Sequence, residues 1–146
     1  MLSQQQISDR LEIQEIVTGY GFAVDNQDWE LWDQIFTEDA VIDYTDVSDH
    51  RDGREATKQW LMMMPRPGTY YHLIVPSRIT VNGDNATSRS ICYNPMPTSP
   101  GLNIVGHWYD DTLRRTPDGW RITSKTLRLC YQIPLPDAVQ PELPVA

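Results

Sequence analysis

The sequence contains little cysteine and no long apolar segment. Its two cysteines, Cys92 and Cys130, lack the spacing of a metal site, and we expect both to pack as small apolar groups in a reducing compartment. The N-terminus, MLSQQQISDR, is polar, and no apolar run approaches the length that crosses a membrane. These absences favour a cytoplasmic protein without a membrane partner.

Basic residues and glycine-rich motifs are also scarce. The chain has 12 Lys and Arg residues against 20 Asp and Glu, a formal net charge of −8, so a nucleic-acid partner is not expected. It has no glycine-rich phosphate loop and no nucleophile-elbow serine. The acidic loop at residues 45–52 matches no calcium-binding template. We therefore expect neither a metal ion nor a cofactor.

The start of the 146-residue chain has the periodicity of a helix. Ser3 and Gln6 form a capping-box pattern. A helix over residues 3–24 is predicted from apolar side chains that recur at three- and four-residue steps, namely Ile13, Ile16, Val17, Tyr20 and Val24. Because Tyr20 belongs to this stripe, its ring is expected to face the interior.

Two shorter helices and a strand are predicted next. Asp28 is a suitable N-cap for a second helix over residues 29–36. Residues 40–44 are β-prone, and residues 54–64 have the pattern of a third helix that Pro65 ends.

The remaining chain has a period of two. Strands are predicted over residues 70–81, 85–93, 102–115 and 120–133, and Asn82-Gly83 is a strong hairpin signal. The three prolines in residues 94–101 predict a wide connection. Helices followed by an antiparallel meander indicate an α+β fold, a cone-shaped barrel in which helices pack on a curved, mostly antiparallel sheet and enclose a pocket. We assign this domain to residues 1–133 and a proline-rich tail to residues 134–146.

Two side chains could together move a proton. Asp25 lies at the end of the first helix, where the macrodipole disfavours an anion unless something compensates it; taken alone, it fits a solvated surface group better. His72 lies in a strand with two apolar faces, which we expect to be covered on both sides, and its role could be purely structural. If Asp25 accepts the Nδ1 proton of His72, Nε2 becomes a general base.

Other polar side chains could complete a pocket. Tyr20 and Tyr44 are suited to donate to a carbonyl or a departing oxygen, although most inward tyrosines are core aromatics. His107 and Tyr109 alternate on one strand face and line the pocket if that face is concave. Arg128 could anchor an acidic substrate or pair with Asp25, and a surface or interface role is at least equally open.

These features together resemble a known family. A long helix, D-x-x-D-W, a short helix, F-x-x-D-A-x-x-x-Y, a third helix and four strands are similar to the layout of the nuclear transport factor 2-like fold. Within that fold, the chain resembles the SnoaL-like branch that holds scytalone dehydratase, hexachlorocyclohexane dehydrochlorinase, bile-acid 7α-dehydratase and polyketide cyclases. The resemblance covers nearly the whole chain.

The resemblance implies roles for individual residues. Asp25 and His72 match the dyad of this branch, with His72 as the base, and Tyr44 and Tyr20 match pocket tyrosines. The ketosteroid isomerases of the same fold instead carry their base carboxylate on the strand, at the position of Tyr44. Asp43 would point to the opposite face, so the isomerase geometry is less favoured.

The positions that would read the substrate differ from those of scytalone dehydratase. Val24 replaces a second tyrosine, and a second pocket histidine is replaced near Ser90. The substrate-binding set expected from the pattern and the resemblance is His107, Tyr109, Val24, Trp29, Ser90 and Arg128.

The favoured hypothesis is a cofactor-independent dehydratase that acts on a small cyclic hydroxy-ketone or polyketide-like substrate. The alternatives are an isomerase or polyketide cyclase of the same fold, or a non-catalytic ligand-binding module similar to dioxygenase β subunits. An exposed convex sheet face with Leu127, Leu129 and Tyr131 predicts a homo-oligomer, and the resemblance favours a trimer over a dimer.

Overall fold

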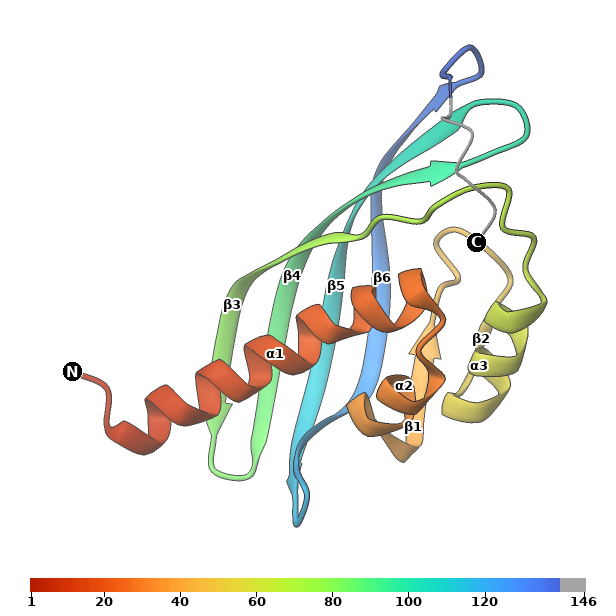
Figure 1. Ribbon diagram of the computed structural model, residues 1–146. Coiled ribbons are helices and arrows are strands. Elements are labelled where there is room, and N and C mark those ends of the chain that lie inside the picture. Colours follow the sequence, from red (N-terminus) through yellow and green to blue (C-terminus); the bar gives the residue numbers. More distant parts are fainter. Residues whose placement is uncertain (140–146) are drawn as a thin grey trace.

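The computed structural model describes residues 1–139, which form helices packed on one curved sheet (Figure 1). The helices are α1 (Gln4–Asn26), α2 (Trp29–Ile35) and α3 (Arg54–Met63). The strands are β1 (Phe36–Asp43), β2 (Arg51–Gly53), β3 (Leu73–Asn82), β4 (Asn85–Pro97), β5 (Leu102–Thr116) and β6 (Gly119–Leu135). Their order across the sheet is β2-β1-β6-β5-β4-β3. Neighbouring strands are antiparallel except β1 and β6, which are parallel.

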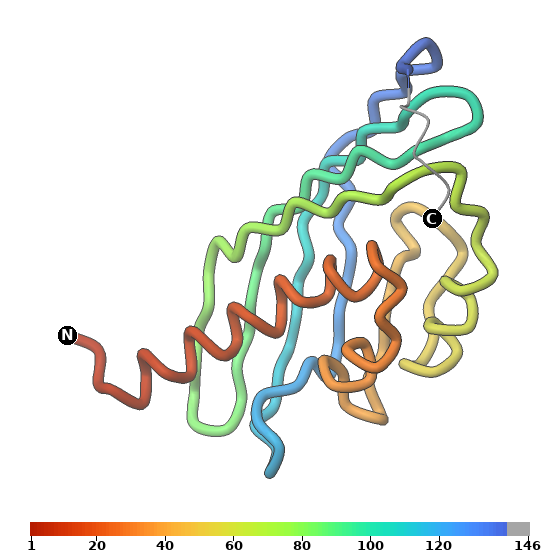
Figure 2. The backbone as a smooth tube through the Cα atoms, viewed as in Figure 1, coloured from red at the N-terminus to blue at the C-terminus, as the bar shows by residue number. Residues whose placement is uncertain are grey.

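The α+β prediction is confirmed, but the sheet does not close into a barrel. Within the described residues, β2 and β3 are its two edges. Figure 2 shows that α1 crosses the concave side of the sheet, while α2 and α3 lie beside the β1–β2 edge. Among these helices, none is long and apolar enough to cross a bilayer.

Local capping residues define the starts of α1 and α2 as predicted. The side chain of Ser3 accepts a hydrogen bond from the Gln6 backbone N–H, and the Gln6 side chain accepts from the Ser3 N–H, so the capping box is present. The Asp28 carboxylate caps α2 by accepting from the Leu31 N–H. Helix α1 continues two residues further than predicted, so Asp25 lies inside its last turn.

The core lies between α1, α2 and the half of the sheet that is lower in Figure 1, and aromatic side chains fill much of it. Trp32, Phe36 and Trp120 are fully buried together with the apolar stripe of α1. The Trp32 and Phe36 rings are 4.5 Å apart between centroids. This packing occupies one end of the concave face.

Strand β4 extends through the segment that we predicted to be a wide connection. Pro95 pairs with Ile104 and Pro97 with Leu102, so only residues 98–101 connect β4 to β5. Proline has no backbone N–H to donate to a neighbouring strand. It is therefore tolerated in an edge strand, at a position where that N–H would point away from the sheet. Strand β3 pairs with β4 only as far as Tyr93, so both prolines lie where β4 has become an edge.

Three predictions about strand faces and boundaries also need correction. His72 precedes β3 rather than lying in it, and Leu73 and Val75 are about half exposed, so this strand is covered on one side only. Leu127 is buried on the concave face rather than exposed on the convex one. Strand β6 continues to Leu135, past its predicted end at residue 133, and most of the predicted tail (140–146) lies outside the described residues.

Candidate active site

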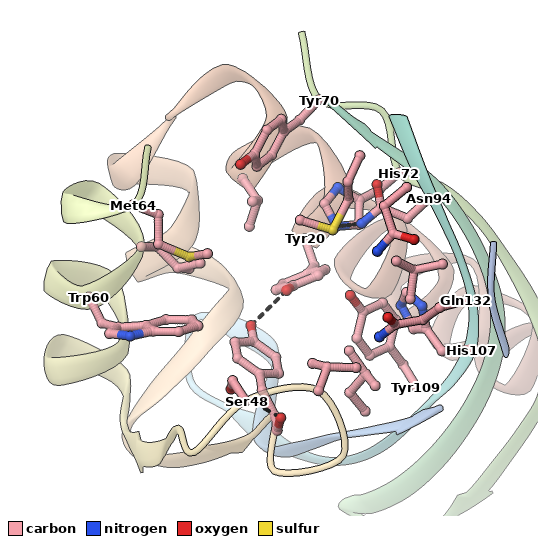
Figure 3. Close-up of a pocket in the computed structure, with 18 residues that line it drawn as sticks. Tyr20, Ser48, Trp60, Met64, Tyr70, His72, Asn94, His107, Tyr109 and Gln132 are labelled. Carbon is pink, nitrogen blue, oxygen red and sulfur yellow. Dashed lines mark hydrogen bonds between the residues drawn. The ribbon is translucent and has the colours of Figure 1, made fainter. Parts of the chain in front are cut away.

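A cavity of about 310 Å³ opens between the end of α1, α3 and the upper part of the concave sheet face (Figure 3). This volume is at the lower end of the range for small-molecule sites, roughly 300–1,000 Å³. Its wall is mainly aromatic and aliphatic, with polar groups on one side. The lining residues are Tyr20, Val24, Tyr44, Val47, Ser48, Trp60, Leu61, Met64, Tyr70, His72, Asn94, Met96, Asn103, Val105, His107, Tyr109, Leu127 and Gln132.

Asp25 and His72 are in direct contact at this cavity. Atom Oδ1 of Asp25 lies 2.6 Å from His72 Nδ1, and Oδ2 accepts the His72 backbone N–H at 2.8 Å. An ionised carboxylate only accepts hydrogen bonds, so Nδ1 carries the ring proton. In the neutral ring Nε2 is then left with its lone pair, and His72 is one of the residues that line the cavity.

Arg66 compensates the unfavourable position of a carboxylate at a helix C-terminus. Its guanidinium donates to the backbone carbonyl oxygens of Val24 and Asp25, at 2.8 and 2.6 Å. A cation at the last helical carbonyls offsets the negative end of the macrodipole. The same guanidinium lies 4.3 Å from the centre of the Tyr70 ring, so Arg66 joins the end of α1 to the segment that precedes His72.

Asn94 faces the other nitrogen of the imidazole. Its amide nitrogen Nδ2 lies 3.0 Å from His72 Nε2, while its carbonyl oxygen Oδ1 is buried without a hydrogen-bond partner. Asn94 does not stand out in the sequence, because the prolines of residues 94–101 predict a connection there. Continuing the inward alternation of Ser88, Ser90 and Cys92 by one step would have indicated it.

The two predicted pocket tyrosines bind each other. The hydroxyls of Tyr20 and Tyr44 lie 2.6 Å apart, and both rings are buried (Figure 3). Burial raises the pKa of each phenol well above its ordinary value, so both are protonated at neutral pH. One O–H is used within the pair, which leaves one to donate to a ligand.

His107 and Tyr109 line the cavity from β5, in the register that their alternation predicted. Their rings meet edge to face, 4.7 Å apart between centroids. Burial, with a smaller contribution from His72, lowers the pKa of His107 to about 4, so its ring is neutral at pH 7. Neither ring nitrogen of His107 has a hydrogen-bond partner. An unpaired buried nitrogen of this kind is available to a polar ligand.

An ion pair is buried beneath the tyrosines. The ammonium of Lys125 lies 2.9 Å from Asp111 Oδ1, and neither side chain is exposed to solvent. The same ammonium lies 4.4 and 4.0 Å from the ring centres of Tyr20 and Tyr109. A cation therefore lies behind the two lining tyrosines, against their aromatic faces, a favourable contact when desolvated.

Comparison with known proteins identifies the fold family. The family model of the SnoaL-like domain matches residues 5–126. The chain belongs to the SnoaL-like domain family. The uncharacterized protein Rv2910c of Mycobacterium tuberculosis is 42% identical to it over 137 residues, which cover 90% of this chain and 92% of that protein.

Solved structures show the same fold in this SnoaL-like domain's neighbours. A scytalone dehydratase candidate from Novosphingobium aromaticivorans has a TM-score of 0.76 at 20% identity, over 95% of this chain and 94% of that one. Hexachlorocyclohexane dehydrochlorinase LinA-type3 from Novosphingobium barchaimii has a TM-score of 0.78 at 18% identity, over 92% and 96%. At these identities the likeness establishes the fold alone.

Three residues expected to bind substrate do not line the cavity of this SnoaL-like domain. Arg128 points to the convex face, is 56% exposed and lies 3.9 Å from Asp110, because it alternates with the inward Leu127. Trp29 packs on Trp32 in the helical layer. Ser90 is fully buried in β4 opposite Tyr109.

Proposed function

We propose that this protein is a cofactor-independent lyase that removes a proton and a leaving hydroxyl from a small cyclic hydroxy-ketone. The observation that carries the proposal is the 2.6 Å contact between the Asp25 carboxylate and His72 Nδ1 at the wall of an aromatic cavity. In this arrangement the carboxylate fixes the tautomer and stabilises the imidazolium that forms when Nε2 takes a proton.

The proposed reaction is an elimination with His72 as the only proton carrier. Nε2 takes the proton from the carbon next to the substrate carbonyl, and the electron pair of that C–H bond enters the enolate. The enolate then forms the carbon–carbon double bond while the C–O bond breaks with its electron pair on oxygen. The departing oxygen takes the proton back from Nε2, and the products are an unsaturated ketone and water.

In this proposal the tyrosine pair stabilises the negative charge that develops on the carbonyl oxygen. Tyr20 and Tyr44 share one hydrogen bond, so the second O–H of the pair can donate to that oxygen. A preorganised donor in a water-poor cavity stabilises an oxyanion more strongly than water does. The neutral ring of His107 supplies a further hydrogen bond to the substrate in this scheme.

The cavity wall favours a neutral ring substrate. No Lys, Arg, Asp or Glu side chain is among the residues that line it within the described chain, so an anionic substrate would lack a counter-charge. The names of the two structural neighbours describe the loss of water and of hydrogen chloride, and hexachlorocyclohexane is a ring compound.

Replacing the base tests this function. We expect His72→Gln to lower kcat on an accepted hydroxy-ketone by roughly 10²–10⁴-fold, with Asp25→Asn also impaired because the ring loses its acceptor. The measurement is the absorbance of the conjugated ketone across a panel of cyclic hydroxy-ketones.

His50→Gln is the matched control, because His50 bonds Thr57 and does not line the cavity. Turnover in His72→Gln equal to that of the wild type would end the assignment. Product analysis separates elimination from isomerisation or cyclisation, since only elimination releases water.

The isomerase alternative lacks its carboxylate in the cavity. Asp43 accepts from the Thr45 backbone N–H and hydroxyl, at 3.0 and 2.6 Å, and it does not line the cavity. The Thr45 hydrogen bonds lower the pKa of Asp43, which makes it a weaker base. Elimination by the dyad is therefore the better-supported chemistry.

A further inference from the structure

Asn94 is hydrogen-bonded to Nε2 of His72, the atom that acts as the base in the proposed reaction. We propose that Asn94 is a positioning residue that follows the proton on His72. Its amide N–H holds the Nε2 lone pair in the resting protein, and its carbonyl oxygen accepts the Nε2–H once a proton has been taken. This inference rests on the proposed function, in which Nε2 is the base.

The hydrogen-bond roles in the resting state follow from Asp25. Because the carboxylate is an acceptor at 2.6 Å from Nδ1, the proton of the neutral ring is on Nδ1 and Nε2 can only accept. The group 3.0 Å from Nε2 must then be a donor, and the donor of Asn94 is its Nδ2 amide. The orientation of the amide is thus fixed by chemistry rather than by the position of its atoms alone.

That orientation leaves one polar atom of Asn94 unsatisfied. Its Oδ1 is buried without a partner, and the whole residue is only 4% exposed. A buried acceptor without a partner is unfavourable. The resting state of the dyad therefore leaves a vacant acceptor next to the base.

Proton transfer reverses the requirement at Nε2. The protonated ring donates from both nitrogens, so an amide N–H opposite Nε2 would face a second donor. A half-turn of the carboxamide about its terminal torsion, which has a broad two-fold profile, brings Oδ1 to the Nε2–H. The same turn gives the unsatisfied oxygen its partner and moves the amide N–H to the position that Oδ1 held.

In the described part of the chain, the other groups that face the imidazole are not hydrogen-bonded to Nε2, so only Asn94 can respond there to the proton. The groups that face the ring are Asp25 and Tyr20 from α1 and His107 from β5. Asp25 is already bound at Nδ1, Tyr20 is bound to Tyr44, and His107 is neutral and makes no hydrogen bond to His72. Among the described residues, Asn94 is the one hydrogen-bonded to Nε2.

The test is a ligand-free measurement on the ring nitrogens. Long-range ¹H–¹⁵N correlation spectra of ¹⁵N-labelled protein report the tautomer and the hydrogen bonding of each imidazole. For Asn94→Ala we expect the Nε2 resonance of His72 to move downfield, toward the value of a bare lone pair, with the proton still on Nδ1. For Asn94→Asp, which can only accept, we expect both nitrogens at imidazolium positions at a pH where the wild-type ring is neutral.

Asn103→Ala is the matched control, since Asn103 lines the same cavity without a hydrogen bond to His72, and the signals of His50 serve as an internal reference. If Asn94→Ala does not give a dispersed spectrum, Asn94→Ser removes the amide with less loss of volume. A Nε2 shift equal in wild type and Asn94→Ala would overturn the proposal, as would a neutral ring in Asn94→Asp over the wild-type pH range.

The outcome is distinguishable from failure of the proposed function. The spectra need no substrate, so they decide the hydrogen bond whether or not the protein is a lyase. If Nε2 shifts as expected while His72→Gln keeps full turnover, the Asn94 bond stands and the base assignment falls.

Discussion

A single glycine sets how closely the helix that carries Asp25 approaches the segment that carries His72. A Cβ atom at Gly21 would lie 3.0 Å from the Cβ of His72 and 3.0 Å from Cδ1 of Ile74. Ordinary carbon–carbon contacts are about 3.5–4.0 Å. Any side chain at this position must therefore push His72 away from α1, and with it the ring nitrogen that meets Asp25.

We expect Gly21→Ala to lower turnover without raising stability. Alanine is preferred over glycine inside a helix by about 1 kcal/mol, but here the gain is offset by displacement of the His72 segment. Gly19→Ala makes the same change two residues earlier, where the new Cβ would meet only Ile35, at 3.5 Å from Cδ1 and 4.0 Å from Cγ1. Urea unfolding and steady-state kinetics of the two variants provide the measurement.

Gly19→Ala should be neutral or more stable and should keep wild-type turnover. Equal behaviour of the two alanine variants would show that the close approach at Gly21 does not position the dyad.

At the same scale, residues that contact each other across the fold could be predicted only in part. Asp25 and His72 were found because the resemblance supplied a pairing that spans 47 positions. The helix-dipole argument indicated that Asp25 needs compensation, but nothing local marks Arg66, 41 positions away, as its source. Asn94 lies in the segment whose prolines predict a connection, so its place beside His72 could be indicated only by extending the alternation of β4 by one step.

At the scale of elements, strands β5 and β6 are held together inside the fold by a charged pair. Lys125 and Asp111 are both fully buried and lie 2.9 Å apart. Burial raises the pKa of Asp111, and the neighbouring ammonium opposes that shift. Removing one partner of such a pair leaves an uncompensated charge in the interior, which typically costs about 3–5 kcal/mol.

We expect Lys125→Met to destabilise the protein by about 3–5 kcal/mol, whereas the double variant Lys125→Met with Asp111→Leu recovers most of that loss. Chemical denaturation with fluorescence detection measures both. Arg114→Met is the control, because Arg114 also lies in β5 but pairs with Asp39 at the surface. This variant should cause no measurable loss of stability. A double variant as unstable as the single one would contradict this account.

Element type followed from local signals, and element ends followed from pairing. The Ser3 and Asp28 caps and the Asn82-Gly83 hairpin are local, and the structure confirms them. The extension of β4 to Pro97 depends on where β3 stops. The shift of register between Gly106 and His107, opposite Tyr131 and Leu129, depends on a bulge in β6. Neither feature can be predicted from the residues of a single strand.

The bulge also explains the mistaken prediction for the outer face of the sheet. Leu127 lies one residue from the outward Arg128 and faces the cavity, and the extra residue Cys130 then changes the phase of β6. As a result, Tyr131 lies on the outer side, with its ring directly over Gly106.

An inward lysine such as Lys125 is equally hard to predict, since a buried charge has the sequence pattern of a surface residue.

At the scale of the whole molecule, the outer sheet face is apolar over several strands. Its large exposed side chains come from β3, β4 and β6, and they are Leu73, Val75, Ile91, Tyr93, Tyr131, Ile133 and Leu135. Register places Val75 beside Ile91 and Leu73 beside Tyr93. Contiguous apolar surface of this kind usually marks an interaction site, so we propose that this face joins copies of the chain in a homo-oligomer. The family resemblance implies a trimer in preference to a dimer.

We expect Ile91→Glu to dissociate that oligomer, because Ile91 lies in the middle of the face and is 45% exposed in a single chain. A buried carboxylate without a partner would be strongly unfavourable at an interface between identical copies. Light scattering coupled to size-exclusion chromatography gives the mass of each form. Phe22→Glu is the matched control, since Phe22 is also exposed but lies on α1, and it should leave the mass unchanged. A wild-type protein that elutes as a monomer at micromolar concentration would rule this interface out, and an oligomer that survives Ile91→Glu would move the contact to another face.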